Sequence, residues 1–190
     1  RNKKTNRKLF SNDECLITSN ISPYLLPMEN IWIRASRHPI NNLRPMTYGS
    51  TPICGGGLIL TVEEKNSLLR QSPHAERFVK DFVGSDEISS GKIRKCLWIE
   101  DSDVNHANSI DFIANRLNQV RISRQKSSRK ATNDFISSPH RFVEIRRGEG
   151  AFIGVQCVSS EKREYLVPML LTDKTIISNR CFGIYSKVEK

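Results

Sequence analysis

Short β-like segments fill the chain from residue 141 onward, directly after a stretch with helical periodicity. Each alternates apolar and polar residues or forms a brief apolar run, as strands do; they are Arg141–Arg147, Ala151–Val158, Tyr165–Leu171, Lys174–Ser178 and Cys181–Tyr185. Upstream, an apolar stripe at helical spacing predicts a helix that begins near Ser102 or Asp103. The stripe consists of Ile110, Ile113, Leu117 and Val120. Helices followed by a run of strands predict an α+β fold, with helices flanking a mostly antiparallel sheet in a single domain.

The chain before that helix alternates turn signals with short regular elements. Residues 39–57 are rich in glycine and proline and predict an irregular loop, and the apolar residues 58–60 predict a short buried strand. Thr61 and Glu64 have the spacing of a capping box and predict a helix start. Strands are also expected over residues 30–34 and 92–99.

A second helix is expected to begin at Ser72-Pro73, because serine is a good N-cap and proline is favoured in the first turn. Its inner face would carry Phe78, Val79 and Phe82, and Gly84 would end it.

Length and composition predict one globular domain. The 190 residues can bury one sizeable core, and 37% hydrophobic with 26% charged residues is typical of a soluble protein. Residues 1–19 are polar and basic and predict a linker or the end of a preceding element, which leaves residues 20–190 as the domain. The apolar runs are too short to span a bilayer and no signal peptide is recognisable, so we expect a cytoplasmic protein.

Residue types that commonly carry catalysis form no recognisable motif. Five cysteines without a C-x-x-C pair, and four histidines without metal-ligand spacing, indicate reduced thiols rather than a zinc site or disulfides. Cys96 and Cys157 lie in strand patterns, where an unreactive thiol is expected. The glycine run at 55–57 lacks phosphate-loop spacing, and Glu63-Glu64-Lys65 fits a helix start better than a nuclease site. We predict no catalytic residue and no metal site in this chain.

The positive charge favours a polyanionic partner. Thirty Lys+Arg against twenty Asp+Glu give a net charge of +10 and a pI near 9.6. Between Arg116 and Arg147 nine basic residues accompany two acidic ones, Asp134 and Glu144. Arginine reads guanine bidentately, whereas Lys, Ser and Thr mainly contact phosphates. The alternative for this region is a solvated helix face with its loop.

A second polar cluster, residues 158–164, lies between two strand patterns and would be presented at a strand connection. Glu161 and Glu164 could pair with Lys162 and Arg163, or accept from cytosine N4 in a DNA-reading loop. Both roles are open from the residues alone.

Distinctive short motifs follow one another in order along most of the chain. They are Asn20-Ile21-Ser22-Pro23-Tyr24-Leu25, Pro45-Met46-Thr47-Tyr48-Gly49, Gly55-Gly56 with Leu58-Ile59-Leu60, Phe82-Val83-Gly84-Ser85-Asp86-Glu87, Gly91-Lys92-Ile93-Arg94-Lys95-Cys96-Leu97-Trp98, Phe142-Val143-Glu144-Ile145-Arg146, Val158-Ser159-Ser160-Glu161-Lys162-Arg163 and Tyr165-Leu166-Val167-Pro168. Together they resemble the target recognition domain of MmeI-like restriction-modification DNA methyltransferases. Two departures occur, both of which we expect the fold to survive. Cys54-Gly55-Gly56-Gly57 replaces the family's Asp-Gly-Gly-Asn, and Lys95 replaces an aromatic residue.

The resemblance implies a module that reads double-stranded DNA and belongs to a larger adenine-N6 methyltransferase chain, with or without a fused endonuclease. In the family, S-adenosylmethionine binds to the methyltransferase part, which carries an N-P-P-Y-type motif. None of the eight prolines here has a proline neighbour, so we expect the recognition module without the catalytic one and no cofactor of its own. The expected partners are duplex DNA and that methyltransferase domain, with no membrane.

Basic and hydroxyl side chains are the candidate DNA contacts. Those expected at base edges are Arg146, Arg147, Ser159, Ser160, Lys162 and Arg163. Those expected at the DNA backbone are Lys92, Arg94, Arg121, Arg124, Lys126 and Arg129. Two alternatives are an RNA-binding module, for which 7% aromatic residues supply few stacking platforms, and a protein-interaction domain with a basic surface.

Overall fold

The computed structural model describes residues 6–188 except 12, 33, 37, 40, 41, 161 and 164. Two compact units divide the chain, Arg1–Pro39 and Ile40–Lys190. In the first unit, strands β1 (Arg7–Ser11) and β2 (Glu14–Thr18) form an antiparallel hairpin. The stretch predicted as a linker or the end of a preceding element contains this hairpin, and the division between the units follows residue 39. No strand is found among the described residues of 30–34, where one was predicted.

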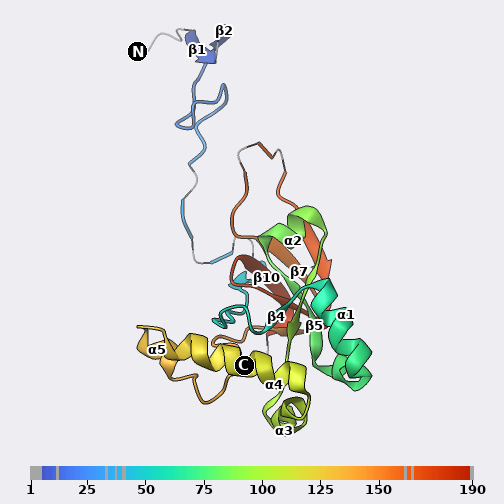
Figure 1. Ribbon diagram of the computed structural model, residues 1–190. Helices are drawn as coiled ribbons and strands as arrows, with labels where there is room; N and C mark the ends of the chain where they lie inside the picture. Colours follow the sequence, from blue (N-terminus) through green and yellow to red (C-terminus); the bar gives the residue numbers. More distant parts are fainter. Residues whose placement is uncertain are drawn as a thin grey trace. The chain divides into compact units, whose positions relative to one another are not determined.

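The second unit contains two four-stranded sheets (Figure 1). The first has the order β4-β6-β5-β9, with bounds β4 Ile59–Leu60, β5 Val79–Val83, β6 Arg94–Leu97 and β9 Thr175–Ile177. The second has the order β3-β10-β7-β8, with bounds β3 Thr47–Tyr48, β7 Gly148–Gln156, β8 Pro168–Leu171 and β10 Cys181–Val188. All pairings are antiparallel except β5 with β9. The α+β class predicted from the sequence is confirmed.

The helices of this unit are mostly short. They are α1 (Val62–Gln71), α2 (Ser85–Ser90), α3 (Val104–Asn108), α4 (Asp111–Gln125) and α5 (Lys130–Asn133), with 3-10 helices η1 (Pro73–Phe78) and η2 (Asp101–Asp103). The capping box of α1 forms as predicted: the Thr61 hydroxyl accepts from the Glu64 N–H, and the Glu64 carboxylate accepts from the Thr61 N–H. Among the described residues, no helix is both long and apolar enough to cross a membrane.

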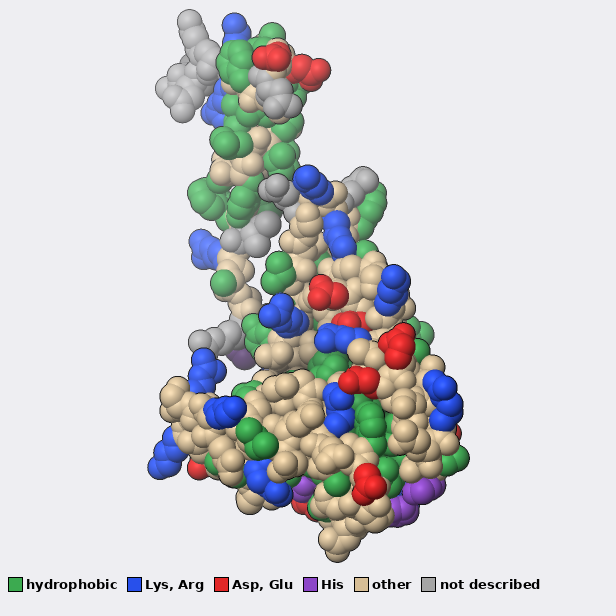
Figure 2. Space-filling view, viewed as in Figure 1, with side chains coloured by type: hydrophobic (Ala, Val, Ile, Leu, Met, Phe, Trp, Pro, Cys, Tyr) green, Lys and Arg blue, Asp and Glu red, His purple; other side chains and the backbone are tan. Residues whose placement is uncertain are grey.

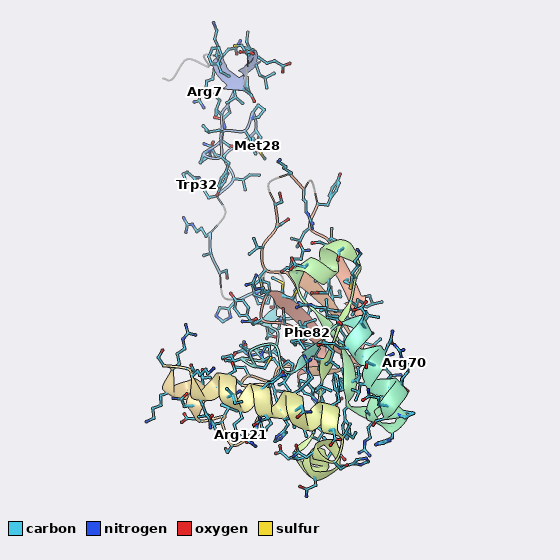
Figure 3. All side chains as sticks on the ribbon, in the orientation of Figure 1. Arg7, Met28, Trp32, Arg70, Phe82 and Arg121 are labelled. Atoms are coloured by element: carbon cyan, nitrogen blue, oxygen red, sulfur yellow. The ribbon has the colours of Figure 1, made fainter. Side chains whose placement is uncertain are left out.

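The predicted helical stripe on α4 is buried and supplies much of the larger core. Ile113, Leu117 and Val120 are at most 2% exposed and pack with Trp98 and Phe142 of neighbouring segments. A smaller core lies between the second sheet and α2. Figure 3 shows Phe82 inside the unit, with Arg70 and Arg121 on the outer sides of α1 and α4. Burial on one side of α4 fixes which of its polar side chains can face a partner.

The helix predicted from Ser72 is wrong beyond its first residues. The chain forms the 3-10 helix η1 and then enters strand β5 at Val79. Phe78 and Phe82 are buried as predicted, but the backbone of residues 79–82 pairs with β6. Strand pairing on both sides of β5 therefore outweighs the helical signal of the sequence. Gly84 begins α2 rather than ending a helix.

The β-like pattern over residues 141–147 also does not form a strand. Among the described residues, this segment pairs with another only through an isolated bridge between Glu144 and Thr51. Regular strand pairing starts at Gly148, the first residue of β7. This irregular segment presents Arg146 and Arg147, two of the candidate contacts.

Candidate nucleic-acid interface

A long connection between β7 and β8, residues 157–167, extends from the second sheet (orange in Figure 1). Ser159, Ser160, Lys162 and Arg163 lie on it and are exposed. The connection is tightened at its tip, where the Arg163 N–H donates to the Ser160 carbonyl oxygen over 3.0 Å. Glu161 and Glu164, the possible partners of the basic residues, lie outside the described residues. The sequence prediction that this cluster is presented at a strand connection is confirmed.

A pocket of about 540 Å³ separates this connection from α2. Its lining includes Ser159, Ser160 and Arg163 from the connection and Ser85 and Ser89 from α2; other lining residues are Asp86, Gln156, Cys157, Val158, Asn179 and Arg180. We call this pocket the α2 pocket. Its hydroxyl, amide and guanidinium groups are the groups that read base edges and phosphates.

Several α2-pocket residues were missed by the sequence prediction. Gln156 is 6% exposed at the end of β7, and Arg180 comes from the turn before β10. Strand pairing and contact with α2 bring these residues together from distant parts of the sequence. Hydrophobic periodicity does not indicate which distant residues meet in this way, so it could not predict the pocket.

Lys92 lies between α2 and β6 and Arg94 is the first residue of β6, and both are exposed. Arg94 is held by Glu87, with Nε 2.6 Å from Oε1, and its guanidinium lies 5.5 Å from the centre of the Phe82 ring. The pKa of the Glu87 carboxyl is lowered: the Arg94 and Gly84 hydrogen bonds outweigh the effect of burial, which is the largest single influence and acts to raise it. Arg94 therefore braces α2, and its remaining surface is open to a phosphate.

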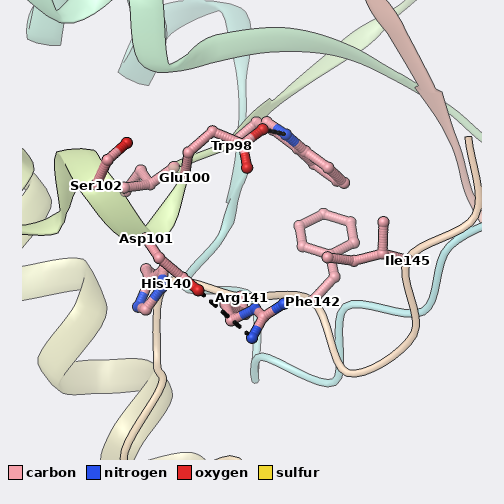
Figure 4. A pocket seen from close by; sticks show the side chains of 9 residues that line it. Trp98, Glu100, Asp101, Ser102, His140, Arg141, Phe142 and Ile145 are labelled. Carbon is pink, nitrogen blue, oxygen red and sulfur yellow. Dashed lines mark hydrogen bonds and ion pairs between the residues drawn. The ribbon is translucent and has the colours of Figure 1, made fainter. Parts of the chain in front are cut away.

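Arg147 lies beside a second pocket of about 280 Å³, lined by Trp98, Ile99, Glu100, Asp101, Ser102, His140, Arg141, Phe142 and Ile145 (Figure 4). The Arg147 guanidinium is 5.5 Å from the Trp98 ring centre and 3.4 Å from the Glu100 carboxylate. Trp98 Nε1 donates to the same carboxylate over 2.9 Å. Arg146 faces Glu144 at 3.5 Å. Both arginines are thus partly committed to carboxylates within the unit.

Asp101 closes the rim of this second pocket. Its carboxylate lies 2.8 Å from His140 Nε2 and 3.6 Å from Arg141 (Figure 4). The hydrogen bond with His140, ahead of the charge of Arg141, lowers the pKa of the Asp101 carboxyl. These contacts fasten the segment after α5 to the start of η2 and give the rim a mixed charge.

The base-contact candidates do not gather at one place. Arg147 precedes β7, whereas Arg163 folds back to Gln156 at the other end of that strand. These two ends of β7 are roughly 25 Å apart at the usual rise of a strand. On a duplex that length corresponds to about seven base-pair steps. The two groups cannot read the same base pair.

The candidates on and after α4 divide into exposed and buried side chains. Arg121, Lys126 and Arg129 are exposed, and Figure 2 shows that basic side chains on the face it presents are scattered among acidic ones. Arg124 has 0% exposure, so its prediction as a DNA-backbone contact is wrong. Its guanidinium donates to the carbonyl oxygens of Pro52, Ile53, Phe135, Ser138 and Arg141. Burial lowers the pKa of Arg124.

Arg116, the first basic residue of α4, has a structural role. It donates to the carbonyl oxygens of Gly56 and Gly57 over 2.9 and 2.8 Å and forms an ion pair with Glu64 at 2.7 Å. Gly55 and Gly56 have positive φ angles of 54° and 87°, which glycine adopts without strain. The glycine run is therefore a structural turn and not a phosphate loop, as the sequence predicted, and the structure adds that Arg116 of α4 braces it. Glu64 serves the helix cap.

Cys96 and Cys157 lack the features of an activated nucleophile. Cys96 is fully buried, and burial raises the pKa of its thiol, as predicted for an unreactive cysteine. Burial also raises the pKa of Cys157, which is partly exposed. In the described part of the chain, no three His, Cys, Asp or Glu side chains group as metal ligands would.

The chain belongs to the MmeI target recognition domain family, whose model matches residues 27–189. DNA methyltransferase A of Bacillus subtilis (strain 168) is 34% identical over 182 residues, which are 96% of this chain and 21% of that protein. The solved structure of the Type IIL restriction-modification enzyme MmeI in complex with DNA matches with a TM-score of 0.77 and 29% identity, over 91% of this chain and 23% of that one. The chain spans about a fifth of the length of each of these proteins.

Proposed function

We propose that this chain reads a specific sequence in double-stranded DNA as the recognition module of a DNA adenine methyltransferase. The α2 pocket carries the proposal, because it presents Arg163, Ser159 and Ser160 on an exposed connection. A relative of the same fold was solved with DNA. In the parent protein, S-adenosylmethionine would bind outside this chain, and cytoplasmic restriction or phage defence is the setting we infer.

Two surfaces of the chain would contact the DNA. The α2 pocket and the adjoining Lys92 and Arg94 would hold the duplex and read bases. Arg121, Lys126 and Arg129 at the end of α4 would contact phosphates, since they are exposed and flanked by short polar residues. Each such phosphate contact releases counterions and makes binding depend on salt.

Binding to random-sequence duplex DNA across a salt series tests the proposal. We expect log K to fall steeply and linearly with log salt concentration, and duplex to be preferred over single-stranded RNA. Preference for the RNA, or binding that salt leaves unchanged, would contradict the proposed function. The full-length parent, measured in the same series, shows whether the methyltransferase part strengthens binding.

Replacing Arg121, Lys126 and Arg129 together with glutamine is expected to make the salt slope shallower by about 2.7, or roughly 0.9 for each phosphate that the variant no longer neutralises. A control triple variant at Lys65, Arg70 and Lys174 removes the same charge from other surfaces and is expected to keep most of the slope. Equal reductions in both variants, measured by fluorescence anisotropy, would show that net charge alone drives binding.

A further inference from the structure

Gln156 is a buried polar side chain whose amide nitrogen and amide oxygen both have hydrogen-bond partners. It is the last residue of β7, is 6% exposed and pairs in register with Cys181 of β10. Its Nε2 donates to the Ser85 carbonyl oxygen over 2.8 Å and to the Ser89 hydroxyl. Its Oε1 accepts from Arg163 Nη1 over 3.2 Å. One carboxamide therefore links α2, β7 and the connection that follows β7.

The orientation of the Gln156 amide follows from its neighbours. A carbonyl oxygen such as that of Ser85 can only accept, and a guanidinium such as that of Arg163 can only donate. Only the orientation with Nε2 toward α2 and Oε1 toward Arg163 satisfies both. The Ser89 hydroxyl donates to the Ser85 carbonyl over 2.9 Å, so it is oriented to accept from Nε2.

Arg163 is restrained at two places. Its backbone N–H closes the turn from Ser160, and its Nη1 is bonded to Gln156. The guanidinium is a rigid planar fork, so fixing one nitrogen limits the plane and direction of the others. Within the described residues, Nε and Nη2 of Arg163 have no partner. Together with the second hydrogen on Nη1, they are the donors left for a ligand at the mouth of the α2 pocket.

We infer that Gln156 is a positioning residue for base recognition: it transmits the position of α2 to Arg163 and aims the free edge of that guanidinium at one base. The inference rests on the proposed function. A preorganised guanidinium loses less side-chain freedom on binding a base edge. The geometric demand of a bidentate contact makes this effect specific to the base pair that Arg163 reads.

The test uses a base-pair substitution scan. The preferred site is first selected from random duplexes with the wild-type chain, or with the full-length parent. Binding to every single-pair variant of that site is then measured for the wild type, Arg163→Ala, Gln156→Met, the double variant and Gln119→Met. Methionine keeps the length of glutamine without its hydrogen bonds, and Gln119 is an exposed residue of α4 that serves as the matched control.

Arg163→Ala is expected to lose about 10-fold of discrimination at one base pair, which identifies the pair it reads. Gln156→Met is expected to lose about 3- to 10-fold at the same pair, with affinity for random DNA and the salt slope unchanged, because the charge of Arg163 is retained. The double variant should lose no more than Arg163→Ala alone, since the glutamine acts through the arginine.

The outcomes separate the two proposals. A wild-type scan with no sequence preference would overturn the proposed function. A clear preference that Gln156→Met leaves intact at the Arg163 pair would overturn the positioning role alone. Equal weakening on every sequence would also overturn it, because a purely structural defect has that signature. Thermal melting of each variant shows whether such a general loss comes from unfolding.

Discussion

Replacing Arg124 with methionine is expected to lower the free energy of unfolding by about 3–5 kcal/mol, as loss of a buried charged partner commonly does. The side chain uses all five of its N–H donors on five carbonyl oxygens at 2.6 to 3.1 Å. Methionine has a similar length but leaves the carbonyl oxygens of Pro52, Ile53 and Arg141 without a donor among the described residues, whereas those of Phe135 and Ser138 keep backbone N–H donors. Each unsatisfied group costs about 1–3 kcal/mol.

Arg121→Met is the matched control for Arg124, because Arg121 lies one turn earlier on α4 and is exposed. Its effect on stability should stay within about 0.5 kcal/mol. Urea denaturation followed by circular dichroism measures both variants. Similar values for the two would show that the buried guanidinium contributes nothing beyond its helix propensity.

Gly49→Ala is expected to destabilise the protein by more than about 3 kcal/mol, which places it among the most disruptive substitutions of a single residue. A Cβ on Gly49 would lie 2.4 Å from the carbonyl oxygens of Ile177 and Ser178. These are backbone atoms, and the same backbone is fixed by hydrogen bonds from Ser50 to Ile177 and from Gly49 to Cys181. No side-chain rotation can relieve the clash, so the backbone at Gly49 must move away from the backbone of residues 177–178.

Gly91→Ala separates this clash from the general cost of replacing a glycine. Gly91 has a φ of 71°, but no atom lies within 4 Å of the position that its Cβ would take. The expected loss is therefore about 1–2 kcal/mol, from backbone strain alone. A Gly49→Ala variant no less stable than Gly91→Ala, by thermal or urea unfolding, would refute the close approach.

Sequence patterns correctly predicted the elements that depend on residues close together in the sequence. The capping box of Thr61 and Glu64 and the stripe Ile113, Leu117 and Val120 appear as expected, because both depend on spacing within one helix. Strand β5 was missed because its pairing partners, β6 and β9, lie elsewhere in the sequence. The sequence of a strand alone does not indicate which distant strand it pairs with, or in which register.

The candidate site shows the same division. Exposure of Ser159, Ser160, Lys162 and Arg163 was predictable from a polar run between two apolar strands. The burial of Arg124 was missed because an arginine was expected at the surface, and its hydrogen-bond partners come from loops at 52–53 and 135–141 that the sequence does not place beside α4. Helical spacing does place Arg124 on the buried face of α4, four residues after Val120 and seven after Leu117, whereas Arg121 lies to one side of it. Only the carbonyl groups supplied by those loops make a buried arginine stable there.

The connection between β7 and β8 leaves and re-enters the sheet at a pair already in register, Val155 with Pro168. Both of its ends are therefore held by strands whose pairing does not depend on what lies between them. Doubling the length of such a connection costs only about 0.6 kcal/mol of closure entropy. On the proposed function, residues 157–167 could therefore be exchanged to change the target sequence while the strand pairing on both sides is kept.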